Sequence, residues 1–145
     1  MRKQLKQKNV KYDFTKCPEL IYDCDFDEGI KDILFLFNKL GLRTEYSCEG
    51  HKGDSSFYIA FDESVTDKQI RDVIQYAANS YDDMNRNPLM LCFNRYMRAF
   101  NKHEMRDNWV FRCSYTSNEN KESKMKIVEK ILEKMVIYNG VISTH

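Results

Sequence analysis

The chain has 145 residues, of which 42% are apolar and 13% aromatic, enough to build one domain around a hydrophobic core. Its 23 basic and 22 acidic residues leave a formal net charge of +1, which argues against binding to duplex nucleic acid, because that function normally requires a basic excess. No apolar run reaches the ~20 residues that span a bilayer, and the basic N-terminus lacks the apolar segment of a secretory signal. We therefore expect a cytoplasmic protein with no membrane partner.

The cysteines also indicate a reducing compartment. There are five of them, an odd number, and no two form a Cys-x-x-Cys pair. We therefore predict free thiols rather than a framework of disulfide bonds.

The N-terminal segment differs in charge from the rest of the chain. Residues 1–16 contain six Lys and Arg side chains and a single acidic one, Asp13. Such a composition is typical of a solvated terminus. We predict a flexible basic arm over residues 1–16 and a single α+β domain over residues 17–145.

The first predicted helix follows Asp25 or Asp27 and ends at Gly41. Its apolar side chains recur at helical spacing: Ile30, Ile33, Leu34, Phe37 and Leu40. Two strands are expected next, over residues 43–48 and 57–62, because residue character alternates there with period two. The alternation places Thr44, Tyr46 and Cys48 on one face of the first strand. It places Phe57, Ile59 and Phe61 on one face of the second.

The second predicted helix opens at Ser64, with Asp67 three positions later as in a capping box. Its apolar positions are Ile70, Val73, Ile74, Ala77 and Tyr81. Two more strands, residues 89–97 and 108–116, precede a third helix that begins near residues 117–118 and ends at Gly140. The buried positions of that helix are expected to be Met125, Val128, Ile131, Leu132 and Met135.

This order of elements predicts the fold class. Each helix has one apolar stripe and each strand has one strongly apolar face. We predict a two-layer α+β fold, in which three helices cover one side of a mainly antiparallel sheet of about four or five strands.

The turn between the first two strands carries unusual chemistry. Ser47, Cys48, Glu49 and His51 bring a hydroxyl, a thiol, a carboxylate and an imidazole together around Gly50. Glycine allows a sharp turn in which backbone N–H groups converge, and these side chains suit the ribose, phosphate or carbonyl groups of a ligand. We therefore predict that Glu49 and His51 contact a ligand.

The same stretch resembles a known group of proteins. Gly41, Thr44 and the run Ser47–His51 form the pattern Gly-x-x-Thr-x-x-Ser-Cys-Glu-Gly-His after a helix, over roughly residues 17–62. This pattern is similar to that of small proteins encoded by phages and prophages of low-GC Gram-positive bacteria, most of which have no assigned activity. The resemblance implies a phage accessory protein that acts in the cytoplasm of the host bacterium.

A second similarity concerns the Ser-Cys-x-Gly core. It resembles the Ser-Ser-Cys-Ser-Gly-Arg segment of the tRNA wybutosine-synthesis methyltransferase family, with Tyr46, Glu49 and His51 in place of that family's first serine, third serine and arginine. The similarity implies, as an alternative function, an enzyme that uses a nucleotide or S-adenosylmethionine.

Three chemical alternatives stay open for this turn. Cys48 and His51 form half of a zinc site, which Cys113, His103 or His145 would have to complete. Cys48 with a histidine base forms a candidate nucleophile, and Glu49 with His51 forms a candidate acid–base pair. A protein-interaction module is the remaining alternative.

Binding without turnover is the favoured interpretation. Arginine forks bind phosphate and aromatic rings stack on bases, and we expect an open sheet face that bears Tyr58, Arg95 and Arg112. Trp109 is assigned either to this site or to the core. The predicted ligand-binding residues are Thr44, Ser47, Glu49, His51, Tyr58, Arg95, Trp109 and Arg112.

Together these features predict a binder of a small nucleotide-derived ligand, which sequesters a host immune signal as a counter-defence. We expect no catalytic residue, no metal ligand and no cofactor, and we expect a homo-oligomer. The expected ligand is a small molecule rather than a nucleic acid.

Overall fold

The computed structural model of the chain describes residues 12–48, 56–79, 92–115 and 121–143. The elements, in chain order, are two short 3-10 helices and then three α-helices and four strands: η1 (Pro18–Asp23), η2 (Glu28–Ile30), α2 (Lys31–Lys39), β1 (Thr44–Cys48), β2 (Ser56–Phe61), α3 (Asp67–Asn79), β3 (Cys92–Asn101), β4 (Glu104–Ser114) and α5 (Lys121–Ser143).

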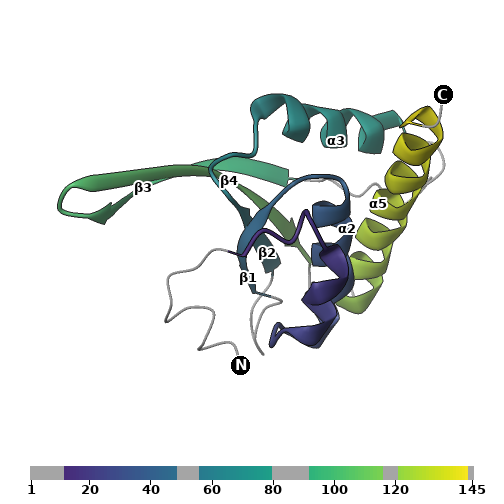
Figure 1. The fold of residues 1–145 in the computed structure, drawn as a ribbon, viewed down its shortest axis with the longest axis horizontal. Helices are drawn as coiled ribbons and strands as arrows, with labels where there is room; N and C mark the ends of the chain where they lie inside the picture. The colour runs from purple at the N-terminus through teal and green to yellow at the C-terminus, as the bar shows by residue number, and fades with distance from the viewer. Residues whose placement is uncertain (1–11, 49–55, 80–91, 116–120, 144–145) are drawn as a thin grey trace.

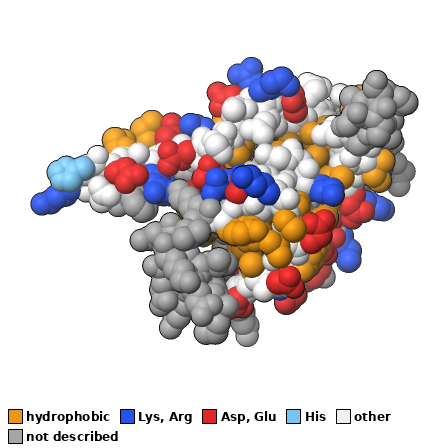
Figure 2. Space-filling view, viewed as in Figure 1, with side chains coloured by type: hydrophobic (Ala, Val, Ile, Leu, Met, Phe, Trp, Pro, Cys, Tyr) orange, Lys and Arg blue, Asp and Glu red, His pale blue; other side chains and the backbone are white. Residues whose placement is uncertain are grey.

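The four strands form one sheet with the order β1-β2-β4-β3, and every neighbouring pair is antiparallel. The helices gather on one side of this sheet, and the β3–β4 hairpin extends well beyond the body of the protein (Figure 1). The predicted α+β class is thus confirmed. The space-filling view shows the hairpin protruding, with the pale-blue histidine of its turn at the tip (Figure 2).

The core lies between the sheet and the helices. Its centre is a group of phenylalanine rings in which Phe37 of α2 makes edge-to-face contacts with Phe61 of β2 and Phe111 of β4, at centroid distances of 5.0 and 5.5 Å. Phe57 contacts Phe111 from the other end of β2 at 6.1 Å. All four rings are fully buried. They join one helix to the two central strands, and so fix the distance between the layers.

The end of α2 explains how the first strand is placed. Gly41 has a φ of 87°, the left-handed conformation that glycine adopts without strain, and its N–H donates to the carbonyl of Asn38. The side-chain amide of Asn38 then donates to the hydroxyl of Thr44 at 2.9 Å. The helix therefore ends where the sequence predicts, and a buried hydrogen bond joins it to β1.

The second and third helices differ from expectation at their ends. Thr66, rather than Ser64, caps α3, because its hydroxyl accepts from the Gln69 N–H while the Gln69 side chain accepts from the Thr66 N–H. Ile74, predicted as a core residue, is 41% exposed. The five predicted core residues of α5 are all buried, but the helix continues through Gly140 to Ser143.

A bulge in β1 changes which residues face the helices. Thr44 pairs with Phe61, whereas Tyr46 pairs with Ala60, so the register shifts by one residue between them. Thr44 therefore points toward α2, while Tyr46 and Cys48 point to the opposite side of the sheet. The sequence alternation, which puts all three on one face, is wrong at Thr44 for this reason.

The N-terminal segment contributes to the core within its described part. Phe14, inside the predicted basic arm of residues 1–16, is buried and contacts Phe26 with a ring-centroid distance of 5.8 Å. Residues 1–11 lie outside the described part of the chain.

Replacing Phe57 by alanine tests the importance of the aromatic core. Phe57 is fully buried, so Phe57→Ala is expected to lower the free energy of unfolding by about 3–5 kcal/mol. The control is Ile74→Ala, which should cost about 1 kcal/mol or less because Ile74 is partly exposed. Urea denaturation of both variants measures the difference; equal losses would contradict this account of the core.

Candidate functional site

The side of the sheet that faces away from the helices, here called the outer face, carries tyrosine and arginine side chains. Register places Tyr58 of β2 directly opposite Arg112 of β4, and Tyr96 of β3 directly opposite Asn108 of β4. The remaining large side chains of the outer face are Tyr46, Arg98 and Arg106. Tyr96 is 52% exposed and Tyr46 36% exposed, so their rings are accessible from solvent.

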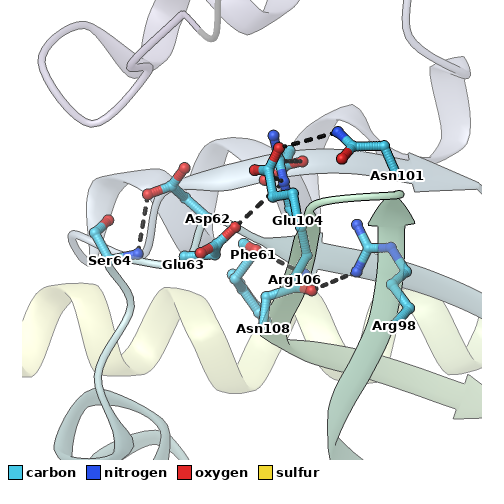
Figure 3. A network of polar contacts seen from close by, with 10 residues as sticks. Phe61, Asp62, Glu63, Ser64, Arg98, Asn101, Glu104, Arg106 and Asn108 are labelled. Atoms are coloured by element: carbon cyan, nitrogen blue, oxygen red, sulfur yellow. Dashed lines mark hydrogen bonds and ion pairs between the residues drawn. The ribbon is translucent and has the colours of Figure 1, made fainter.

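Asn108 organises this face at the end of β2. Backbone pairing of β2 with β4 stops at Ala60 and Val110, and the carbonyl of the next residue, Phe61, accepts instead from the side-chain amide of Asn108 at 3.0 Å. The amide oxygen of Asn108 accepts from Nη1 of Arg98 at 2.7 Å (Figure 3). Because Asn108 is only 1% exposed and both ends of its amide are used, it holds the Arg98 guanidinium in place.

A second arginine of the outer face is surrounded by carboxylates. Arg106 forms ion pairs with Glu45, Glu63 and Glu104, at N–O distances of 3.2, 3.4 and 3.3 Å. These acids come from the β1 bulge, from the segment after β2 and from β4, and two of them are seen beside Arg106 in Figure 3. Arg106 therefore ties three segments together, and the three carboxylates around it outnumber its single positive charge.

Aromatic contacts connect Arg98 with Arg112. The guanidinium carbon of Arg98 lies 5.5 Å from the Tyr96 ring centroid and 5.9 Å from that of Tyr46. Tyr46 contacts Tyr58 edge to face at 6.4 Å, and Arg112 lies 5.2 Å from the Tyr58 ring centroid. The three arginine–tyrosine distances are cation–π distances.

Arg98 and Arg112 differ from the other arginines of the β3–β4 hairpin in their charge environment. Within the described part of the chain, neither has a carboxylate at ion-pair distance; Arg98 donates to Asn108, and Arg112 donates to the Ser56 hydroxyl at 3.2 Å. By contrast, Arg95 is paired with Asp107 at 2.7 Å, and Arg106 with three glutamates. The outer face thus presents two guanidinium groups whose positive charge no described acid neutralises.

Burial governs the titration of Tyr58. Desolvation raises the pKa of its hydroxyl, the neighbouring Cys48 and Tyr46 raise it further, and Arg112 lowers it. Tyr58 is therefore neutral at physiological pH, and its O–H can donate a hydrogen bond to an anionic group.

The residues predicted from sequence divide between the two sides of the sheet. Tyr58 and Arg112 meet on the outer face. The expectation that Arg95 shares this face is wrong, because Arg95 pairs with Trp109 on the helix side and lies 5.6 Å above that ring. Trp109 packs against the core and its indole N–H donates to Asp67, at the start of α3, at 2.9 Å.

The residues around the polar turn are only partly described. Thr44 is buried under α2, and Ser47 pairs with Ile59, whose side chain belongs to the core. Glu49 and His51 lie outside the described residues. Their predicted contact with a ligand stays a prediction.

Sequence reasoning missed Tyr46, Arg98 and Asn108 as members of one site. The missing signal is the length of the hairpin: β3 continues to Asn101 and β4 begins at Glu104, so the alternation can be followed through Arg98. With that register, the outer-face positions of β3 are Cys92, Asn94, Tyr96 and Arg98.

Comparison with known proteins adds the family. The YoqC prophage protein family matches residues 19–140 of the chain. The chain belongs to this family. No curated protein and no solved structure matches it significantly.

The family match supports the phage or prophage origin that the Ser-Cys-Glu-Gly-His pattern implied. It leaves open both that pattern as a family mark and the similarity to the tRNA wybutosine-synthesis methyltransferase family.

Two further properties concern only the described ranges. None of the helices within residues 12–48, 56–79, 92–115 and 121–143 is long and apolar enough to cross a membrane. Over the same ranges, no three His, Cys, Asp or Glu side chains are grouped so that they could hold a metal ion.

Asn108→Ala tests the role of the buried amide. The substitution leaves the Phe61 carbonyl and the Arg98 guanidinium without this partner, so we expect a loss of about 1–3 kcal/mol in the free energy of unfolding. Asn94→Ala, a neighbouring exposed position of the outer face, should change it by no more than about 0.5 kcal/mol. The prediction fails if denaturant titration gives the same small loss for both.

Alkaline titration tests the contact between Arg112 and Tyr58. Because Arg112 lowers the pKa of Tyr58 while burial raises it, Arg112→Gln should move that pKa further upward. A tyrosine with a raised pKa in the folded state stabilises the fold below its ordinary value of 10.0, and that contribution is lost as pH rises above it. Phenolate absorbance, compared with that of Tyr58→Phe, identifies the step; an unchanged step in Arg112→Gln would contradict the contact.

Proposed function

We propose that this prophage protein binds a small nucleotide-derived ligand on its outer face. The supporting observation is the pair Arg98 and Arg112, two guanidinium groups that lie over tyrosine rings and have no carboxylate partner among the described residues. Arginine forks recognise phosphate, and tyrosine rings stack on bases, so the two residue types together match the two halves of a nucleotide.

Preorganisation makes Arg98 the stronger of the two contacts. Its side chain is held by the buried Asn108 and packed between Tyr46 and Tyr96, so little conformational entropy remains to be lost when a ligand binds. Arg112 is more exposed and is oriented by Ser56 and Tyr58. We infer that Arg98 anchors a phosphate group and that Arg112 adds a second contact.

The polar turn is part of the same proposal. Cys48 points to the outer face and pairs with Tyr58, and Glu49 and His51 follow it directly in the chain. We propose that these two side chains contact the ribose or base of the ligand, and that the protein sequesters a nucleotide signal of host immunity in the bacterial cytoplasm.

Ligand binding is expected to depend on the outer-face arginines. We expect a nucleotide at a hundred times its dissociation constant to add about 2.7 kcal/mol to the stability of the parent protein. Arg98→Gln and Arg112→Gln should each weaken binding at least about tenfold, because each removes a charge-assisted hydrogen bond. Thermal shift against a panel of mononucleotides, dinucleotides, ADP-ribose and S-adenosylmethionine, followed by calorimetry, measures both effects.

Arg71→Gln supplies the matched control. Arg71 is an exposed residue of α3, so this variant makes the same change of charge away from the outer face and should bind like the parent. Equal weakening in all three variants would show a nonspecific charge effect, and no stabilisation by any compound would refute the proposal. Recovery of a cleaved or methylated ligand after heat denaturation would instead assign the protein to the enzymes.

A further inference from the structure

We propose that the ligand carries two phosphate groups separated by a nucleoside, as a dinucleotide does. This inference rests on the proposed function and specifies its substrate class. It starts from the observation that the outer face presents two arginines that no described acid neutralises, each in contact with a tyrosine of one aromatic pair.

The two arginines start from well-separated backbone positions on the outer face. Arg98 is opposite Arg106 on β4, and Arg112 lies six residues farther along that strand, so their backbones are about 20 Å apart. Both side chains reach inward: the Arg98 guanidinium lies over Tyr46, the Arg112 guanidinium over Tyr58, and these two rings are 6.4 Å apart. A chain of contacts thus runs from Arg98 through Tyr46 and Tyr58 to Arg112.

Each guanidinium retains donors for a ligand. Arg98 and Arg112 each use Nη1 for a hydrogen bond within the protein, to Asn108 and to Ser56 respectively. A guanidinium has five N–H donors in a planar fork, so the remaining donors of each can bind phosphate oxygens. Because Asn108 and Ser56 each hold one nitrogen of a guanidinium group, the positions of the two anion contacts are fixed relative to the sheet.

The aromatic surface of Tyr46 and Tyr58 suits a nucleoside better than a further phosphate group. Its side chains are neutral: Tyr46 and Tyr58, with the register pair Ala60 and Val110 beside them. The nearest acid of β1, Glu45, is already paired with Arg106. We infer that a base and its ribose lie on this surface and that each arginine then binds its own phosphate.

The test compares ligands that differ in the number of phosphate groups. Calorimetry of the full-length protein with 5′-phosphorylated dinucleotides, cyclic dinucleotides and nucleoside monophosphates, each in adenine, guanine, cytosine and uracil forms, should show a dinucleotide binding at least about tenfold more tightly than any monophosphate. Arg98→Gln and Arg112→Gln should each weaken that dinucleotide about tenfold, whereas a monophosphate should respond to only one of them. Arg71→Gln should change neither, and the melting temperature of each variant verifies that it is folded.

The outcomes separate this inference from the proposed function. Equal affinity for a monophosphate and a dinucleotide would overturn the two-phosphate inference and leave nucleotide binding standing. Binding of neither would overturn both. A single-stranded ten-nucleotide oligomer that binds much more tightly than every dinucleotide, with a salt dependence steeper than two phosphate contacts produce, would also overturn the inference, because the ligand would then be a nucleic acid strand.

Discussion

The sheet depends on a hydrogen bond to the carbonyl of Phe61. β2 ends there while β4 continues toward the hairpin tip, so this carbonyl has lost its strand partner in the interior of the sheet. A buried carbonyl without a hydrogen bond is costly, and the side chain of Asn108 supplies the missing donor. An amide has both a donor and an acceptor, so the same residue that completes the sheet also fixes Arg98 above it. One side chain thus completes the sheet and positions an arginine of the outer face.

Much of this fold follows from local patterns. The apolar stripes of the three α-helices and the alternation in β2 were sufficient, because burial of Ile30, Phe37 or Phe57 is visible in the spacing of neighbouring residues. The β1 bulge was not visible, since a single extra residue changes the face of everything after it without changing residue type. Ile74 follows the same helical spacing as the buried Ile70 and Val73 yet is exposed, so the local period does not encode how wide the buried stripe of α3 is.

The candidate site was harder to predict for the same reason. Tyr58 and Arg112 were assigned correctly to one face, because both lie on strands with clear alternation. The expectation for Arg95 fails, since its face is set by the register with Trp109, and its ion pair with Asp107 becomes visible only in the paired strands. The joining of Tyr46 to Arg98 requires the bulge in β1 and a long side chain that crosses β4, and both are properties of the assembled sheet.

Net charge gives little information about such a site, and the arrangement of acids explains why. A formal charge of +1 suggests no affinity for anions, yet that sum hides two arginines without described acidic partners beside a third that has three. Glu45, Glu63 and Glu104 surround Arg106 and outnumber its single positive charge, whereas Arg98 and Arg112 have no described carboxylate at ion-pair distance. Two cationic contacts are too few for strong, salt-dependent binding to a duplex, which draws on many phosphates. The small anion that we propose as ligand would need only these two contacts, so the proposal depends on the local arrangement of charge rather than on its total.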